Sequence, residues 1–357
     1  MPFDQKPPRT TLRSVASLVE AGAVAPDDRE RLEAVSRDFA IAVSPAMLAA
    51  MRPGDPLDPI ARQFVPAPEE LDVAQADLAD PIGDEAHSPV EGIVHRYRDR
   101  VLLKPIHVCP VYCRFCFRRE VVGPGSETLS STALEAAIGY IRAHDEIWEV
   151  ILSGGDPLML SPRRLSEIVA ALGAIPHVGV IRLHTRVPVA APERVTDALV
   201  AALDTEKAVY VVLHCNHADE LGTAAAAACR RIVRAGIPML SQSVLLRGVN
   251  DDPATMAALL RTLVRHRIKP YYLHHADLAR GTGHFRTSIA EGQALMRALR
   301  GDVSGLCQPT YVLDIPGGHG KVPVGPTYLS ADGPDGRTVR DPHGNSHAYP
   351  PEQDHKN

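Results

Sequence analysis

The sequence predicts an α/β fold in which parallel strands form a partial barrel. Six short segments between residues 99 and 275 are rich in β-branched and apolar residues, as is typical of parallel strands that helices cover. Amphipathic segments separate them, because each crossover between parallel strands needs its own helix. A doubly wound open sheet is the alternative, but no glycine-rich dinucleotide fingerprint follows the first strand.

The element boundaries follow from the change between strand-like and helix-like periodicity. We expect strands at 99–107, 149–154, 178–184, 208–214, 238–246 and 269–275. We expect helices at 132–144, 162–175, 192–204, 220–236, 253–267 and 288–301. Residues 91–306 would thus form the core domain, and a last strand near 310 leads into a glycine-rich loop.

The two regions that flank the core domain differ from it in periodicity and composition. Residues 1–90 are expected to form a helical region, with helices within 11–24 and 26–43. Residues 53–72, rich in proline, are expected to form turns and an extended crossing. Residues 307–357 form a C-terminal segment whose polar end, 331–357, is expected to lack regular structure.

Composition excludes some classes of function. The 357 residues contain 38 Lys+Arg and 43 Asp+Glu, a net charge of −5, which argues against a nucleic-acid binder. No apolar run approaches the roughly 18 residues that a membrane span needs, and the N-terminus lacks the apolar stretch of a secretory signal. We therefore expect a cytoplasmic protein with neither a membrane nor a nucleic-acid partner.

Three cysteines form the strongest motif. Cys109, Cys113 and Cys116 have the spacing C-x3-C-x2-C directly after the first expected strand. Three thiolates can hold three irons of a four-iron cluster and leave the fourth iron open to a chelating ligand. A zinc site completed by His107 is the alternative. The other cysteines, Cys215, Cys229 and Cys307, are expected to be small buried apolar residues.

Two glycine-containing turns also end strands. Ser153-Gly154-Gly155-Asp156 ends the second strand, where small residues would let the backbone approach a ligand, although a bare turn would look the same. Lys321 follows a glycine-rich turn that begins at Asp314. The phosphate-binding P-loop spacing fails there. A lysine that forms a Schiff base fits better, with a solvated loop lysine as the alternative.

Together, these motifs resemble the lysine 2,3-aminomutase family of radical S-adenosylmethionine (SAM) enzymes, which also carry pyridoxal 5′-phosphate (PLP). The resemblance covers residues 85 to 327 and includes three further motifs: His95–Arg100, Pro270–Leu273 and His284–Thr287. It implies a (β/α)6 barrel of the radical SAM type, and a [4Fe-4S] cluster, SAM and PLP as cofactors.

The resemblance also implies residue roles. Lys321 would be the catalytic residue that bonds PLP, with Arg96 and Tyr97 contacting this cofactor and Ser241–Val244 facing the same cavity. Cys109, Cys113 and Cys116 would bind the cluster, and Ser153, Gly154, Gly155 and Asp156 would bind SAM. Arg118 would bind the substrate carboxylate, and Asp277 and Asp314 would bind the distal ammonium of lysine.

The implied reaction is the conversion of L-lysine to β-lysine, and the two aspartates disfavour glutamate as substrate. An alternative is the same chemistry on a lysine of translation elongation factor P, because the short length resembles the branch of the family that modifies this factor. The intact Asp-x-Pro-Gly-Gly element at 314–318 favours free lysine.

No cysteine follows Cys307, whereas longer members have a C-terminal zinc-binding cluster. A homo-oligomer and an electron donor such as flavodoxin or ferredoxin are expected, and a non-catalytic iron–sulfur or zinc protein is a further alternative.

Overall fold

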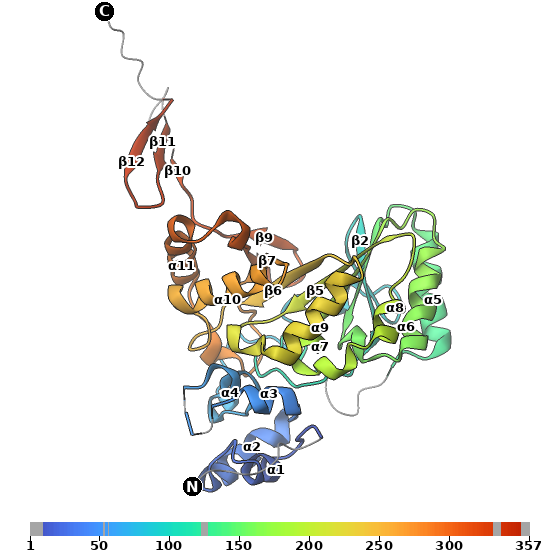
Figure 1. Cartoon of the computed structure of the whole chain (residues 1–357), viewed down its shortest axis with the longest axis horizontal. Coiled ribbons are helices and arrows are strands. Elements are labelled where there is room, and N and C mark those ends of the chain that lie inside the picture. The colour runs from blue at the N-terminus through green and yellow to red at the C-terminus, as the bar shows by residue number, and fades with distance from the viewer. Residues whose placement is uncertain (1–9, 53, 56, 123–127, 331–336, 351–357) are drawn as a thin grey trace, which may run out of the picture.

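A curved nine-stranded sheet forms the centre of the chain. The computed structural model describes all residues except 1–9, 53, 56, 123–127, 331–336 and 351–357. The strands are β1 (Ile93–Tyr97), β2 (Arg100–Ile106), β3 (Glu149–Gly154), β4 (Val180–Thr185), β5 (Ala208–His214), β6 (Met239–Val244), β7 (Ile268–His274), β8 (Thr310–Asp314) and β9 (Lys321–Pro323). They lie side by side in chain order (Figure 1). Strands β2 to β8 are parallel, and β1 and β9 pair antiparallel at the two edges.

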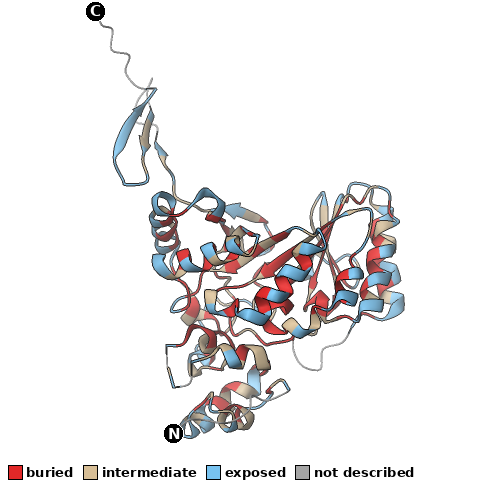
Figure 2. Ribbon diagram, viewed as in Figure 1, coloured by how far each residue is buried: buried red, intermediate tan, exposed pale blue. Residues whose placement is uncertain are grey.

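Helices between the parallel strands cover the outer face of this sheet (Figure 1). They are α5 (Ser131–Ala143), α6 (Pro162–Gly173), α7 (Val187–Ala190), α8 (Asp197–Ala201), α9 (Thr223–Arg234), α10 (Pro253–Arg265) and α11 (Ile289–Asp302). Because consecutive strands are neighbours and such crossovers are right-handed, all crossover helices fall on one face. Figure 2 shows the buried residues concentrated in the strands and on the helix faces that meet them.

The expected α/β class and partial barrel are confirmed. Each of the six expected strands is present, with ends that differ by two residues or fewer from those predicted. The edge strands β1 and β9 were not predicted. Both are short, β1 is only partly buried and β9 is mostly exposed, so they carry little apolar pattern. Cys215, Cys229 and Cys307 are buried, as expected. Among the described residues, no helix has the length and apolarity that crossing a bilayer requires.

The sheet curls until its two edge strands approach each other. The backbone N–H of Lys321 in β9 donates a hydrogen bond to the hydroxyl of Tyr97 in β1, at 2.7 Å. The guanidinium of Arg96 lies 4.0 Å from the carboxylate of Asp314, which ends β8. These contacts bring the first and last strands of the sheet to the same place, so the partial barrel is closed there by side chains.

An N-terminal helical region lies beneath the sheet in Figure 1. It contains α1 (Val15–Glu20), α2 (Arg29–Asp38), α3 (Pro45–Ala50) and α4 (Pro59–Phe64), and the short 3-10 helices η1 (Pro26–Asp28), η2 (Pro68–Leu71) and η3 (Glu85–His87). The prediction of turns and an extended crossing over 53–72 is wrong where α4 and η2 form. Asp58 caps α4 by accepting the N–H groups of Ile60 and Ala61, and Pro59 suits the first helical position.

One buried carboxylate attaches this region to the core. Glu70 accepts hydrogen bonds from Nε and Nη2 of Arg114, at 2.9 and 2.6 Å, and forms a further ion pair with Arg119. All three side chains are excluded from solvent. Arg114 also donates to the carbonyl oxygen of Ala40. Since Arg114 and Arg119 lie within and just after the cysteine motif, Glu70 fixes that loop to the N-terminal region.

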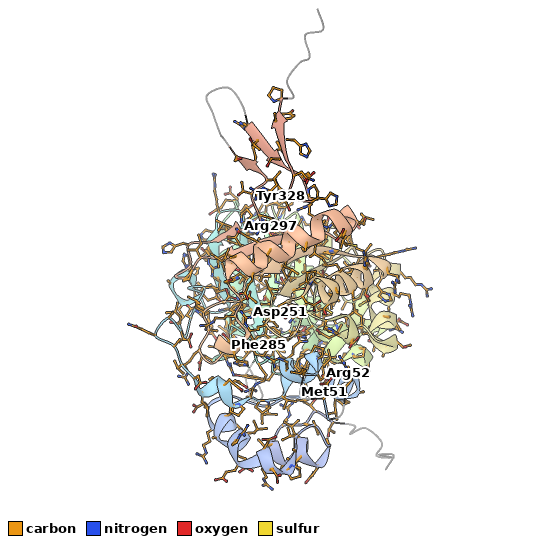
Figure 3. The ribbon with its side chains drawn as sticks, turned by 90° about the vertical axis from the view of Figure 1, so that its left-hand side faces the viewer. Met51, Arg52, Asp251, Phe285, Arg297 and Tyr328 are labelled. Carbon is orange, nitrogen blue, oxygen red and sulfur yellow. The ribbon has the colours of Figure 1, made fainter. Side chains whose placement is uncertain are left out.

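The C-terminal residues form a second, small sheet. It consists of β10 (Leu329–Ser330), β11 (Arg337–Arg340) and β12 (Ser346–Tyr349), and it extends away from the body of the chain (Figure 1). Figure 3 shows Tyr328 at its base, next to α11, which carries Arg297. The prediction that 331–357 lack regular structure is therefore wrong for β11 and β12, whose short exposed strands have no apolar alternation.

We expect Glu70→Gln to lower the free energy of unfolding by about 3–5 kcal/mol, because two buried cations lose their counter-charge. Glu33→Gln is the matched control, since Glu33 forms an exposed pair with Arg29, and its loss should cost less than about 1 kcal/mol. Denaturant unfolding followed by circular dichroism measures both. Equal small losses in the two variants would show that Glu70 does not hold the N-terminal region.

Candidate active site

The residues singled out by sequence lie together at one edge of the barrel. Parallel strands place their carboxyl ends at the same edge, where α/β barrels carry their active sites. The strand ends and following loops there supply the cysteine motif after β2, Ser153–Asp156 at β3, His184–Arg186 at β4, His214 at β5, Gln242 in β6, His274 and Asp277 at β7, and Asp314 at β8. Ser241–Val244 form the end of β6 at this edge, and their contact with the Lys321 cavity stays a prediction.

The cysteine loop holds three free thiols close together. Cys109, Cys113 and Cys116 are partly exposed as residues. Burial of the sulfur atoms raises the pKa of all three thiols, that of Cys116 to about 11. Neighbouring cysteines contribute to the raised pKa of Cys109 and Cys116. Thiols in such surroundings become thiolates only beside a strong positive charge, as iron would provide. The donor set therefore fits an iron–sulfur cluster held by these three residues.

His107 is the residue on which the zinc alternative depends. Burial lowers the pKa of its imidazole, and its Nδ1 is buried without a hydrogen-bond partner; these features suit a ligand of any kind and do not separate zinc from other uses. Within the described ranges, no group of three or more His, Cys, Asp and Glu side chains, the three cysteines included, is arranged to hold a single metal ion. A four-iron cluster does not need that arrangement, because each cysteine bonds a different iron atom.

The two glycines at the end of β3 pack against the backbone that leads into the cysteine loop. The N–H of Gly155 donates to the carbonyl oxygen of Ile106 at 2.7 Å. A Cβ atom at Gly155 would lie 2.5 Å from the carbonyl carbon of His107, and one at Gly154 would lie 2.8 Å from the oxygen of Ile106. Any larger residue would push the cysteine loop away from β3, so these glycines shape the loop directly.

Asp156 is engaged entirely by protein donors. Its buried carboxylate accepts the Thr185 hydroxyl at 2.7 Å and the N–H groups of Arg186, Val187 and Leu158 at 2.6, 3.1 and 3.0 Å. These bonds tie the end of β3 to the end of β4. SAM binding by Ser153, Gly154, Gly155 and Asp156 stays a prediction. For Asp156, the structure supports a role in positioning these strand ends.

Lys321 and Asp314 face each other across a β-hairpin. They are register partners in the antiparallel pair of β8 and β9, and the Lys321 ammonium forms an ion pair with the Asp314 carboxylate. The Nδ1 atom of His274 lies 3.1 Å from the lysine Nζ and 3.4 Å from the Asp314 carboxylate. Burial lowers the pKa of Lys321, and Asp314 offsets part of this effect.

The hairpin needs glycines because of its backbone conformation and, at one position, because of close packing. Gly317, Gly318 and Gly320 have φ values of +81°, +83° and +95°, which other residues rarely adopt. A Cβ at Gly318 would lie 2.5 Å from the imidazole of His87. The glycine turn therefore lies directly against the segment around Gly83 and His87, and this contact sets the position of Lys321.

The surroundings of Lys321 fit PLP. The amine is partly accessible and its pKa is lowered, which favours the neutral nucleophile. Arg96 from β1 lies nearby, and its Nε is buried without a hydrogen-bond partner, so one donor remains for a phosphate group. Tyr97 accepts the Lys321 backbone N–H. Arg96 and Tyr97 thus reach the Lys321 site from β1, although their contact with a cofactor stays a prediction.

Asp84, which the sequence analysis did not identify, joins the two expected anion-binding arginines. Its carboxylate accepts Arg118 Nε at 2.8 Å and Arg96 Nη2 at 3.1 Å. Burial alone would raise the pKa of Asp84, but Arg118 lowers it below its ordinary value. Arg118 also donates to the hydroxyl of Ser153 at 3.4 Å. The bonds to Asp84 fix both guanidinium groups, and no local motif marked this residue.

Asp277 and Asp314 lie close enough to influence each other's charge. Burial raises the pKa of Asp277 to about 7, and the negative charge of Asp314 contributes. Burial would also raise the pKa of Asp314, but His274 and Lys321 lower it well below the ordinary value. The pocket therefore holds one firmly ionised carboxylate and a second that becomes ionised when a further cation enters.

Three histidines also lie at strand ends on this edge of the barrel. Burial lowers the pKa of His184, His214 and His274, so all three are neutral at pH 7. The Nε2 atoms of His184 and His214 are buried without hydrogen-bond partners. Neutral imidazoles with free nitrogen atoms can bind polar groups of a ligand. Their position at strand ends was the only signal available in the sequence.

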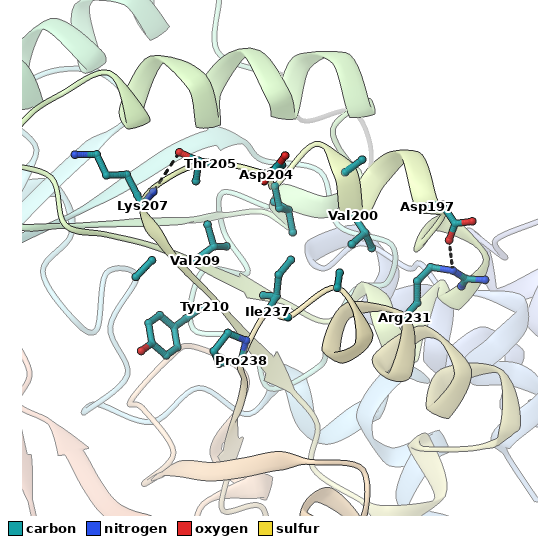
Figure 4. Close-up of a pocket in the computed structure, with 15 residues that line it drawn as sticks. Asp197, Val200, Asp204, Thr205, Lys207, Val209, Tyr210, Arg231, Ile237 and Pro238 are labelled. Carbon is teal, nitrogen blue, oxygen red and sulfur yellow. Dashed lines mark hydrogen bonds and ion pairs between the residues drawn. The ribbon is translucent and has the colours of Figure 1, made fainter.

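A separate hollow lies at the opposite end of the barrel. It has a volume of about 600 Å³ and is lined by the beginning of β5, the residues before β6 and parts of α8 and α9 (Figure 4). Asp197 and Arg231 pair at its rim. It contains none of the sequence motifs described above, so its size does not make it the active site.

Comparison with known proteins assigns the class. The Radical SAM superfamily matches residues 103–260, and the Lysine-2,3-aminomutase family matches residues 296–357. L-lysine 2,3-aminomutase of Clostridium subterminale is 40% identical over 321 residues, which are 90% of this chain and 77% of that protein. Glutamate 2,3-aminomutase of Clostridioides difficile is 38% identical over 86% of this chain and 73% of that protein.

The fold and the cysteine loop thus define a radical SAM enzyme. Within this class, the chain belongs to the lysine 2,3-aminomutase family. Membership implies a [4Fe-4S] cluster, SAM and PLP as cofactors. Among solved structures, a radical SAM methyltransferase from Sphaerobacter thermophilus matches with a TM-score of 0.44 and 19% identity over 62% of this chain and 68% of that chain.

The raised pKa of Asp277 predicts a pH-dependent loss of stability in the cofactor-free protein. The folded state binds a proton more tightly than the unfolded state, so stability falls as pH rises from about 4 to about 7 and then levels off. Asp277→Asn lacks this titration. In thermal melts of both proteins, the stability of the variant relative to the native chain should increase as the pH rises across this range. A difference in stability that does not change with pH would contradict the raised pKa of Asp277.

Proposed function

We propose that the protein converts L-lysine to β-lysine by moving the amino group from carbon 2 to carbon 3. The observation that carries the proposal is the pair Asp277 and Asp314 beside Lys321. Two carboxylates in one pocket favour a substrate with a distal ammonium group and disfavour an acidic side chain. The names of several relatives agree with this substrate class.

The protein would hold each cofactor with residues of its own. Cys109, Cys113 and Cys116 would hold the cluster, and Lys321 would bond PLP with Arg96 beside it. When bound, the cluster with SAM supplies a carbon radical that abstracts hydrogen, and PLP supplies the π-system across which nitrogen moves. An electron-transfer protein such as flavodoxin or ferredoxin would reduce the cluster.

The remaining residues bind and orient the substrate. Arg118, held at Nε by Asp84, would bind the α-carboxylate, for which its planar guanidinium is suited. The Lys321 amine, which pairs with Asp314 in this structure, would bond PLP. Asp314 and Asp277 would then be free to pair with the distal ammonium of lysine. The two carboxylates would thus accept the substrate ammonium when the Lys321 amine no longer pairs with them.

Two other substrates, a lysine of elongation factor P and glutamate, are alternatives to free lysine. A lysine on elongation factor P would present the same ammonium chain, so the aspartate pair does not exclude it. Glutamate is the substrate in the name of one relative, but it would place a third carboxylate next to Asp277 and Asp314. We therefore favour free lysine.

The first test is anaerobic reconstitution with iron, sulfide and PLP, followed by incubation with SAM, a reductant and L-lysine. We expect β-lysine by mass spectrometry. Cleavage of SAM without β-lysine, followed by modification of elongation factor P, would support the protein-bound substrate instead. No cleavage of SAM by a fully loaded cluster would contradict the enzyme itself.

Lys321→Ala should abolish covalent PLP binding. After reconstitution and desalting, the variant should lack the visible absorbance of bound PLP and retain the iron–sulfur content of the native protein. Lys207→Ala is the control, because Lys207 lies at the opposite end of the barrel. Retained PLP absorbance in Lys321→Ala would disprove the assignment of this lysine.

Asp277→Asn should lower kcat/KM for L-lysine by about 100-fold, because a charge pair with the substrate ammonium is lost. Most of the loss should appear in KM. Asp197→Asn, which changes an exposed aspartate in the distant hollow, should leave kcat/KM unchanged. Similar kinetics for Asp277→Asn and the native enzyme would remove Asp277 from the substrate site.

A further inference from the structure

Arg186 contacts a sulfur atom of the cysteine loop from a rigid position. It directly follows β4 and is buried. Its Nη1 lies 3.4 Å from Sγ of Cys113, and its Nη2 donates to Gln63 Oε1 at 2.7 Å and to Glu220 Oε2 at 2.6 Å. The backbone N–H of Arg186 donates to Asp156 at 2.6 Å. Both ends of this residue are thus fixed independently of the sulfur.

The partners of Arg186 are themselves fixed. Glu220 Oε1 accepts the N–H groups of Asn216 and His217 at 2.8 and 2.9 Å, and the Gln63 amide at 3.2 Å. The guanidinium carbon lies 4.7 Å from the ring centre of Phe64 and 5.4 Å from that of Phe115. These rings limit access of water, so the charge of Arg186 acts in a medium of low dielectric constant.

We propose that Arg186 is a positioning residue that holds the Cys113 sulfur and raises the reduction potential of the cluster. The inference rests on the proposed ligation of the cluster by the three cysteines. Reduction adds one negative charge to the cluster and its thiolates. A cationic N–H donor at a ligand sulfur stabilises this more negative state most. Arginine keeps its charge at every accessible pH, so the effect does not depend on titration.

This role differs from that of the other arginines near the loop. Arg114 and Arg119 are paired with Glu70 and fix the loop as a unit. Arg118 is held by Asp84 and faces the Lys321 side of the pocket. Among the ligand cysteines, Cys113 is the one that receives a side-chain donor within the described part of the chain.

The test is the midpoint potential of the cluster in the absence of SAM, measured by redox titration with electron paramagnetic resonance. Arg186→Met should bind iron and sulfide and show a more negative potential, with at least a tenfold lower ratio of reduced to oxidised cluster at a fixed potential. For one electron this corresponds to about 59 mV. Arg182→Met is the matched control, because Arg182 is a buried arginine of β4 that pairs with Glu149 at 2.9 Å; its potential should stay near that of the native protein.

Glu220→Gln tests the same idea in the opposite direction. It keeps the guanidinium in the chain and removes its counter-charge, so the potential should become less negative. If Arg186→Met fails to fold or to hold the cluster, the shift in Glu220→Gln decides. A loaded Arg186→Met cluster with the native potential, or a native potential in Glu220→Gln, would overturn the inference. Failure of the native protein to form any cluster would instead contradict the proposed function.

Discussion

The buried carboxylate of Glu70 is the constraint on which the active site depends. Arg114 lies between two cluster cysteines, and its guanidinium is far too polar to be buried without a partner. Glu70 is supplied by a segment more than forty residues earlier, and it neutralises Arg114 and Arg119 together. The cysteine loop can therefore take its position only when the N-terminal region is docked. On its other side, the loop is limited by Gly154 and Gly155, which leave no space for movement toward β3.

A second constraint balances the charges of the pocket. Asp84 and Asp314 both lie close to Arg96, and Asp314 also meets Lys321. Each cation is thus held by a carboxylate that it shares with a neighbour, and the carboxylate Asp277 remains without a firm partner, as its raised pKa indicates. Cofactor and substrate bring one phosphate, one carboxylate and ammonium groups to the same space. Because Asp84 and Asp314 are each shared by two cations, a side chain can release one partner to a ligand and no charge is left unpaired in the buried site.

Sequence reasoning predicted what depends on neighbours along the chain. The strands were found because each is a short apolar run between turns, and the cysteines were found because one loop holds all three. Asp84 escaped notice because its partners Arg96 and Arg118 are 12 and 34 residues away and meet it only through the fold. The C-terminal sheet was not predicted, because its exposed strands need no apolar pattern. The packing of Gly154 and Gly155 against the loop backbone was not predicted, because it joins segments about fifty residues apart, and their contact with a ligand stays a prediction.

These contacts change how the chain should be divided. The change in periodicity near residue 90 predicted a helical region, 1–90, and a core domain, 91–306. Side-chain contacts cross this boundary. Glu70 holds one side of the cysteine loop, and Gln63 reaches Arg186 and Glu220 on the other side. A fragment of residues 91–306 would leave the guanidinium groups of Arg114 and Arg119 without a counter-ion and that of Arg186 without Gln63. Breaking one buried pair costs about 3–5 kcal/mol, a large fraction of the roughly 5–15 kcal/mol by which native proteins are stable. The N-terminal region is therefore part of the same packed unit as the cysteine loop.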